Sequence, residues 1–176
     1  MKQSPYTFSE DSELLGEGLQ QIGYAENFLE IGIGYGSNLK RFAHNFALAV
    51  GTDIQTLAHM KGILSSEYEI VITDKGSCFR PGVFDVVAFN PPYLPSNAII
   101  DSSVDGGKSG IEVPLAFLKE ALRAAKSQCK VLLVLSTHCD LNEFRSFCNS
   151  RGLKFELVAQ KNLFFETLLA YVIRKS

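Results

Sequence analysis

The sequence predicts an α/β fold: a mostly parallel seven-stranded sheet with helices on both faces and a C-terminal antiparallel hairpin. Three observations lead to this prediction. Strand-like and helix-like segments alternate along most of the chain, as they do where parallel strands are joined by helical crossovers. Several strand-like segments are continuous aliphatic runs, which indicates burial on both faces of a sheet. The last two follow each other without a helix between them. At 176 residues we expect one domain, residues 1–176.

The expected elements follow from the spacing of apolar residues. The expected strands are 28–34, 47–53, 69–74, 83–90, 130–136, 155–159 and 167–173. Five helices are expected, and four of them are recognised by an apolar face. The first has Leu14, Leu15, Leu19 and Ile22 on this face, and the second has Leu39, Phe42, Ala43 and Phe46. The third covers 55–64, the fourth has Leu115, Leu118, Leu122 and Ala125 on its apolar face, and the fifth has Leu141, Phe144 and Cys148. Ser9 is a candidate N-cap of the first helix, whose first turn is acidic, and Pro114 suits the first position of the fourth.

Polar residues gather where the expected strands end. The segment from Glu30 to Gly36, then Asp53, Asp74 and the segment from Asn90 to Tyr93 all fall at carboxyl ends of strands. Ligands of open α/β sheets bind outside these ends, near the point where the strand order reverses. We therefore expect these residues to line one crevice.

Composition excludes several function classes. Seventeen basic and 19 acidic side chains give a net charge of −2, which argues against tight non-specific binding of nucleic acid. The first residues lack the apolar segment of a signal peptide, and the longest aliphatic run, 131–135, is too short to span a bilayer. The four cysteines form no C-x-x-C pair and have no histidine at metal-ligand spacing. We expect a cytoplasmic protein with reduced thiols, no metal site and no membrane contact.

The glycine-rich segment EIGIGYG lies between an expected strand and an expected helix. Gly32, Gly34 and Gly36 have the spacing G-x-G-x-G, which differs from the dinucleotide pattern G-x-G-x-x-G because position 37 is Ser. The segment can be a tight structural turn or a cofactor loop. Asp53, some 21 residues after Gly32, can accept hydrogen bonds from the ribose of NAD or of S-adenosylmethionine.

Glu30 distinguishes between these two cofactors. A carboxylate about 5 Å from a pyrophosphate costs roughly 3 kcal/mol per charge pair at an effective dielectric constant near 20. S-adenosylmethionine instead brings a sulfonium and an ammonium group, which the same carboxylate attracts. The loop therefore favours S-adenosylmethionine. Asp74 can accept a hydrogen bond from the adenine amino group, although Asp53 and Asp74 can also be ordinary acids of strand-end turns.

The segment FNPPY at 89–93 ends the fourth strand with two prolines. Proline lacks an N–H group and holds the preceding residue extended, so Asn90 and Pro91 are expected to be extended. The Asn90 side-chain carbonyl and the Pro91 backbone carbonyl then face the crevice as a fixed pair of acceptors. Such a pair can hold a planar –NH2 group on which Tyr93 stacks. The other interpretation is a strand terminator that binds nothing.

The acceptor pair suits one kind of chemistry. An amide or exocyclic amine nitrogen shares its lone pair with a π-system and is a poor nucleophile. Hydrogen bonds from its two N–H groups to fixed acceptors return electron density to nitrogen and aim it at a methyl group. No strong base is required, because the proton leaves after the nitrogen becomes cationic. The segment therefore predicts methyl transfer to a planar nitrogen.

With these motifs the chain resembles the class I S-adenosylmethionine-dependent methyltransferases that carry an NPPY motif. It is most similar to the HemK-type protein glutamine N5-methyltransferases, in the short branch that modifies class 1 release factors in archaea and eukaryotes. The resemblance rests on YTFSEDSELL at 6–15, EIGIGYG at 30–36, TD at 52–53, ITD at 72–74, FNPPY at 89–93 and GGKSG at 106–110. Phe8 stands where the family usually has proline.

The resemblance implies a Rossmann-like class I methyltransferase fold, S-adenosylmethionine as the cofactor and a glutamine in a GGQ-type loop of a release factor as the substrate. The implied cofactor-binding residues are Ser12, Glu30, Gly32, Gly34, Gly36, Asp53, Asp74, Lys75 and Asn90, and the implied catalytic residues are Asn90, Pro91, Pro92 and Tyr93. The short branch lacks the N-terminal helical domain of the bacterial enzymes, for which this chain has no room. It works with a small zinc-binding activator that covers a hydrophobic sheet edge, for which 69–73 is a candidate.

Two alternatives remain. An adenine-N6 methyltransferase of DNA or RNA would present the same pocket to a flipped base, but it needs affinity for the nucleic-acid backbone or an added recognition domain. The acidic sequence pI near 5.9 and the short chain count against it. The second alternative is a non-catalytic scaffold that binds S-adenosylmethionine.

Overall fold

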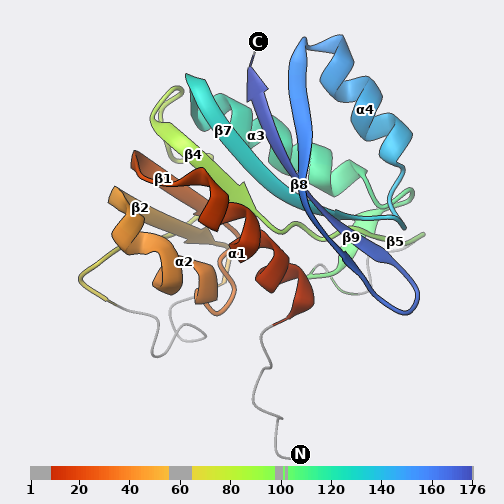
Figure 1. The fold of residues 1–176 in the computed structure, drawn as a ribbon, viewed down its shortest axis with the longest axis horizontal. Coiled ribbons are helices and arrows are strands. Elements are labelled where there is room, and N and C mark those ends of the chain that lie inside the picture. The colour runs from red at the N-terminus through yellow and green to blue at the C-terminus, as the bar shows by residue number, and fades with distance from the viewer. Residues whose placement is uncertain (1–8, 56–64, 98–100, 102, 176) are drawn as a thin grey trace, which may run out of the picture.

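The computed structural model describes residues 9–55, 65–97, 101 and 103–175. Seven strands form one sheet in the order β3-β2-β1-β4-β7-β9-β8 (Figure 1). They are β1 Ala25–Ile31, β2 Phe46–Asp53, β3 Glu69–Ile72, β4 Phe84–Phe89, β7 Ala125–Ser136, β8 Leu153–Asn162 and β9 Thr167–Lys175. The first five pair in parallel, and β9 runs antiparallel to both β7 and β8. The mostly parallel sheet with its C-terminal hairpin is confirmed.

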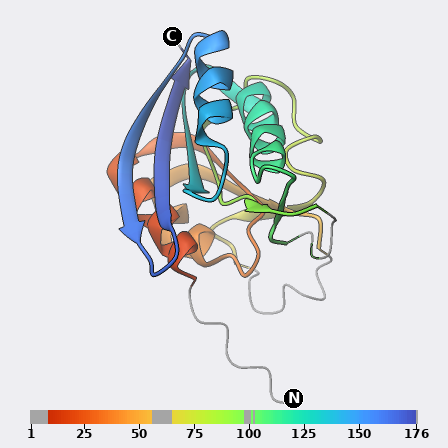
Figure 2. The ribbon, with the colours of Figure 1, turned by 90° about the vertical axis from the view of Figure 1, so that its right-hand side faces the viewer.

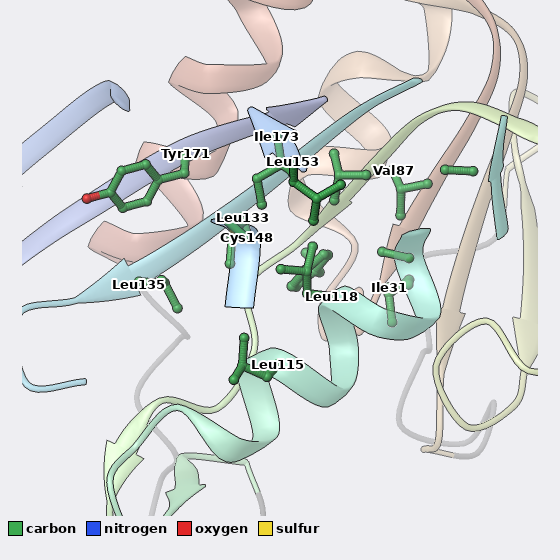
Figure 3. Close-up of a cluster of buried hydrophobic side chains, with 14 of the residues drawn as sticks. Ile31, Val87, Leu115, Leu118, Leu133, Leu135, Cys148, Leu153, Tyr171 and Ile173 are labelled. Carbon is green, nitrogen blue, oxygen red and sulfur yellow. The ribbon is translucent and has the colours of Figure 1, made fainter. Parts of the chain in front are cut away.

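Helices cover both faces of this sheet, as predicted. They are α1 Glu10–Ile22, α2 Ser37–Phe42, α3 Glu112–Ala124 and α4 Leu141–Ser150, with a 3-10 turn, η1, at Ala43–Asn45. Figure 2 shows α3 and α4 together on one side of the sheet. One buried cluster joins them to the strands; it includes Leu115 and Leu118 of α3 together with Val87, Leu133 and Ile31, all labelled in Figure 3. A second cluster joins α1 and α2 to the opposite face.

The first helix is held by its apolar side. Leu14, Leu15 and Leu19 are at most 1% exposed, and burying a side chain of this kind stabilises the fold by about 1.5–3 kcal/mol. Ser9 occupies the N-cap position as predicted, but its side chain makes no capping hydrogen bond. Its hydroxyl instead lies 2.8 Å from Oγ of Ser12, in the first turn of α1.

Several boundaries differ from the expected ones. The second helix ends at Phe42 rather than extending to Phe46, which begins β2. Phe46 pairs with Ala25 of β1, and its ring stacks on Phe28 with centroids 4.4 Å apart, so sheet pairing and aromatic packing outweigh the helical spacing. Pro114 is the third residue of α3 rather than the first, and the first turn still tolerates its missing N–H.

The remaining differences concern strand lengths. The first strand runs from 25 to 31 rather than from 28 to 34, because the glycine loop that follows is not part of it. The third strand ends at residue 72 rather than 74, β7 begins at 125 rather than 130, and β8 runs from 153 to 162 rather than from 155 to 159. The bounds of β2, β4 and β9 differ from the expected ones by one or two residues. The helix expected over 55–64 lies outside the described residues, apart from residue 55.

The sheet has one point where the strand order reverses. From β1 the chain proceeds outward through β2 to β3, and then returns to add β4 and β7 on the other side of β1. The carboxyl ends of β1, β2 and β4 therefore meet at one place, where open α/β sheets bind ligands.

All four cysteines are free thiols, and Cys129, Cys139 and Cys148 are buried. Within the described ranges, no group of three or more His, Cys, Asp and Glu side chains is placed to hold a metal ion. None of the described helices combines the length and the apolar character needed to cross a membrane.

Candidate active site at the carboxyl ends of the central strands

Two adjoining cavities open where β1, β2 and β4 end. The large cavity has a volume of about 480 Å³, and its walls include these predicted residues: Ser12, Glu30, Gly32, Gly34, Asp53, Asn90 and Pro92. The small cavity has a volume of about 150 Å³ and is lined by Asp11, Asn90, Pro91, Pro92, Tyr93, Leu94, Ser103, Val104 and Glu166. Asn90 and Asp11 line both cavities, so the two spaces meet at these side chains.

The glycine loop is fixed to the end of β2 by its backbone. The N–H groups of Gly32 and Ile33 donate to the carbonyl of Thr52 at 2.8 and 3.0 Å, and the N–H of Gly34 donates to Oδ2 of Asp53 at 2.9 Å. Gly34 has φ +51°, and an added Cβ would meet no atom within 4 Å. Glycine is therefore favoured here by the left-handed backbone rather than by lack of space.

Glu30 is a buried acid in the wall of the large cavity. Its side chain is 4% exposed, and its Oε2 atom has no hydrogen-bond partner among the described residues. Burial raises its pKa to about 8, although a hydrogen bond from the Leu39 backbone opposes this shift. The carboxyl is therefore mostly neutral at pH 7, and a cationic ligand that reaches Oε2 would favour the charged form. The attraction for a cation expected from the sequence is thus coupled to loss of a proton.

The Asn90 side chain presents a free acceptor between the cavities. Its amide donates a hydrogen bond to the Asp11 carboxylate, while its Oδ1 atom is buried and has no partner in the described part of the chain. A buried polar atom without a partner is costly, so this oxygen suits a ligand that supplies an N–H or O–H donor. The expected role of Asn90 and Pro91 as a pair of ligand acceptors stays a prediction.

Tyr93 and Asp11 join the NPPY segment to α1. The Tyr93 hydroxyl donates to Oδ2 of Asp11 at 3.2 Å, and the Ser12 N–H donates to Oδ1 at 2.8 Å. Burial alone would raise the pKa of Asp11, but hydrogen bonds from Ser9, Asn90, Ser12 and Tyr93 lower it below its ordinary value. Burial, followed by the charges of Asp11 and Glu166, raises the pKa of Tyr93, so the phenol stays neutral.

Asp11 is the site residue that the sequence analysis missed. It entered the prediction only as one of three acids in the first turn of a helix. The available signal was its position directly before Ser12 in the SEDS segment, but the sequence alone does not show that this turn faces Asn90.

No family model matches the chain. A protein of Methanocaldococcus jannaschii with the provisional name protein N5-glutamine methyltransferase is 29% identical over 179 residues, which covers 93% of this chain and 88% of the relative. A second similar protein is a chain of the solved Mtq2–Trm112 complex of E. cuniculi, which is described as responsible for methylation of the translation termination factor eRF1. That chain is 23% identical to this one, with a TM-score of 0.80, and the match covers 97% of this chain and 98% of that one.

Two further solved structures have the same architecture. One is an rRNA methylase from Streptococcus thermophilus, with 12% identity, a TM-score of 0.66 and coverage of 97% of this chain and 99% of that one. The other is a provisionally assigned methyltransferase of Streptococcus mutans with SAH bound, with 15% identity, a TM-score of 0.60 and coverage of 97% and 100%. The chain has the class I methyltransferase fold. Its resemblance to the HemK-type enzymes, indicated by the motifs, is confirmed by the similarity to the M. jannaschii protein.

In this methyltransferase fold, three predicted cofactor residues line neither cavity: Gly36, Asp74 and Lys75. Asp74 lies in the turn after β3, and its side chain is 70% exposed and pairs with Lys75 Nζ at 2.7 Å. Lys75 Nζ lies 5.3 Å from the ring centroid of Phe117, which does line the large cavity. The Asp74–Lys75 pair therefore lies beside the cavity wall rather than in it.

The segment after the NPPY motif is anchored beside the small cavity. Leu94–Pro95 forms β5 and pairs with β6, Asp105–Gly107, and the Cys139 thiol donates to the Tyr93 carbonyl at 3.4 Å. Gly106 packs against this backbone so closely that an added Cβ would lie 2.6 Å from Cα of Tyr93. The 94–110 stretch thus contains two short paired strands.

Proposed function

We propose that the protein is an S-adenosylmethionine-dependent N-methyltransferase that methylates the side-chain amide of a glutamine in a protein. The proposed substrate is the GGQ-type loop of a class 1 translation release factor. The observation that carries this proposal is the buried Oδ1 atom of Asn90, which lies at the junction of the two cavities and has no hydrogen-bond partner among the residues that the structure describes. The M. jannaschii relative and the E. cuniculi complex support the choice of a protein amide as the acceptor.

The large cavity fits the cofactor in its chemistry. Glu30 offers an unpartnered buried oxygen where a sulfonium or ammonium group is attracted, and Asp53, which is 9% exposed, lines the same space for a ribose. Ser12, Gly32, Gly34 and Asn90 complete the proposed contacts, with Gly36, Asp74 and Lys75 in supporting positions. S-adenosylmethionine, when bound, supplies an electrophilic methyl group.

The small cavity fits the acceptor in its size. Its volume of about 150 Å³ corresponds to about five water molecules in the liquid. A glutamine side chain has a similar number of non-hydrogen atoms, so the cavity accommodates the proposed acceptor.

Catalysis in this proposal comes from orientation. Asn90 Oδ1 and the Pro91 carbonyl accept hydrogen bonds from the two N–H groups of the amide and aim its nitrogen toward the large cavity. Pro92 fixes the backbone on which both acceptors lie. Tyr93 stays neutral and lies beside the amide plane, with its hydroxyl held by Asp11.

A partner subunit is the second part of the proposal. β3 is an edge strand of the sheet, and its Ile72 is 42% exposed. We propose that a small zinc-binding activator covers this edge, as the HemK-type resemblance implies; the E. cuniculi methyltransferase was solved in complex with Trm112. An enzyme that modifies a translation factor in this way acts in the cytoplasm.

One experiment separates the candidate functions. The chain, co-expressed with the proposed activator, is incubated with methyl-labelled S-adenosylmethionine and with either a class 1 release factor or DNA and RNA. We expect label in the release factor, located by peptide mass spectrometry on the glutamine side chain. Methylated adenine would support the nucleic-acid alternative, and cofactor binding without any transfer would support the scaffold.

A further inference from the structure

The small cavity has room for one side chain, so the rest of a polypeptide substrate must lie outside it. Two apolar side chains of its wall are partly exposed: Leu94 from β5 and Val104, just before β6, which also lines the large cavity. They are 38% and 40% exposed, so both contribute apolar surface to the rim as well as to the wall. The rim of this polar cavity is therefore partly apolar.

A second apolar feature immediately precedes a residue of the same cavity in the chain. Phe164 and Phe165, in the turn between β8 and β9, are 92% and 83% exposed and pack edge-to-face with ring centroids 4.6 Å apart. Glu166, the next residue, lines the small cavity. The turn that carries the two rings is thus directly continuous with the cavity wall.

The position of this aromatic pair is fixed by its neighbours. The Leu163 N–H donates to the Glu166 carbonyl at 2.8 Å, which closes the turn, and the Ser136 hydroxyl donates to the Glu166 carboxylate. Two adjacent phenylalanines at this level of exposure contribute little to the core, and contiguous exposed apolar surface marks interaction sites. Their exposure indicates a role in binding rather than in folding.

We propose that Leu94, Val104, Phe164 and Phe165, called the apolar rim below, bind the polypeptide segment that flanks the methylated glutamine. The inference rests on the proposed function and adds to it the surface that recognises the protein substrate. When the glutamine side chain of the substrate occupies the small cavity, the substrate residues on either side of it lie outside the cavity, where the apolar rim can contact them. Aromatic residues are enriched at the centres of protein interfaces, where they supply most of the binding energy.

Charge favours a polypeptide over a single-stranded nucleic acid. Proteins that stack bases on exposed aromatic rings combine them with a positively charged groove. Here the described walls of the small cavity contain two acids, Asp11 and Glu166, and no lysine or arginine. Lys161 on β8 is already paired with Glu13 of α1 at 2.7 Å. A phosphate backbone would meet an unfavourable potential at this mouth.

The test compares two sets of exposed aromatic residues. The double variant Phe164→Ser, Phe165→Ser removes the aromatic part of the rim, and Tyr24→Ser removes a tyrosine that is 74% exposed just before β1, at the amino-terminal end of that strand. With the full chain, its activator and the intact release factor, we expect the double variant to raise KM about tenfold or more. We expect the kcat of the double variant and its dissociation constant for S-adenosylmethionine to stay within twofold of the wild-type values. Its Tm should stay within a few degrees of the wild-type Tm.

Three outcomes overturn the inference. If the double variant and Tyr24→Ser have the same KM for the release factor, the apolar rim does not bind the substrate, while the proposed function stands. A wild-type enzyme that methylates no release factor would remove the proposed function and the rim with it. A double variant that loses affinity for a single-stranded oligonucleotide, but not for the release factor, would assign the aromatic pair to nucleic acid.

Discussion

The hydroxyl of Tyr93 donates a hydrogen bond to Oδ2 of Asp11, 82 residues earlier in the chain, at 3.2 Å. The same carboxylate accepts a hydrogen bond from the amide of Asn90. One side chain from the first turn of α1 therefore sets the orientation of two residues of the NPPY segment. With its amide nitrogen held by Asp11, Asn90 directs its oxygen away from α1, where it remains available to a ligand.

Asp11→Asn should therefore impair methyl transfer although Asp11 is not one of the proposed acceptors. The substitution keeps the size of the side chain and removes its charge, and a hydrogen bond to a charged group contributes about 1.5–3 kcal/mol. We expect kcat to fall about tenfold to a hundredfold, with a smaller change in the dissociation constant of S-adenosylmethionine measured by calorimetry. Glu13→Gln, in the same helical turn but paired outward with Lys161, is the control. An equal loss of kcat in both variants would contradict this role.

Asn90→Ala tests the acceptor itself. The change removes Oδ1, the buried atom without a partner, and leaves the NPPY backbone in place. Loss of one preorganised electrostatic contact in an active site lowers kcat by about 10²–10³. We expect that loss in single-turnover assays with the release factor, while the Kd for S-adenosylmethionine changes only a few-fold. Asn142→Ala on α4 provides the control, and full activity of Asn90→Ala would point to another reacting group.

The central part of this site could be predicted because it depends on chain order. Glu30, Asp53 and Asn90 each lie at or near the carboxyl end of a strand. Parallel pairing brings those ends together, and this does not depend on the conformation of the loops. The extension of the second helix to Phe46 was wrong because a helical spacing of apolar residues does not reveal that Phe46 stacks on Phe28 of β1.

The role of Asp11 could not be predicted for a related reason. An acid in the first turn of a helix is already explained by the helix dipole, so nothing local distinguishes a site residue from an ordinary one. Its partners, Asn90 and Tyr93, become visible only when the angle at which α1 crosses the sheet is known. Likewise, the short third strand ends at Ile72, and its length places Asp74 in an exposed turn rather than in the cavity wall.

We expect Glu30 to make both the free energy of unfolding and the affinity for the cofactor depend on pH. Burial raises its pKa from 4.5 to about 8 in the folded protein, so the folded state binds more protons than the unfolded state between these values. The free energy of unfolding without cofactor should therefore decrease as pH rises from about 4.5 to 8. Glu30→Gln should remove this contribution, which urea denaturation at pH 5 and pH 8 can measure.

Binding of the cation should show the opposite dependence. Because the charged carboxylate attracts the sulfonium and ammonium groups, affinity for S-adenosylmethionine should rise with pH up to about 8. Close to neutral pH, binding should release up to about one proton, which calorimetry in buffers of different ionisation enthalpy detects. In Glu30→Gln both the proton release and the rise in affinity should disappear. Proton release that persists in the variant would assign it to another group.

Gly106→Ala should disturb the NPPY segment, because Gly106 packs against the backbone of Tyr93. An added Cβ would lie 2.6 Å from Cα of Tyr93 and 2.7 Å from the Gly110 carbonyl oxygen, and backbone atoms cannot move aside without displacing β5 and β6. Overpacking of this kind costs about 1–3 kcal/mol. We expect a lower Tm together with a loss of kcat. Gly76→Ala, whose added Cβ would make only ordinary contacts of 3.6 Å or more, should change neither by much.

The two edges of the sheet allow a matched test of the partner surface. Ile72 on β3 and Leu157 on β8 are 42% and 44% exposed on the two opposite edge strands. If the activator covers β3, Ile72→Asp places a charge in an apolar contact and should weaken the complex about tenfold or more, whereas Leu157→Asp should not. The measurement is the dissociation constant of the two purified subunits. Weakening by Leu157→Asp alone would place the partner on the opposite edge, because both substitutions introduce the same charge at similar exposure.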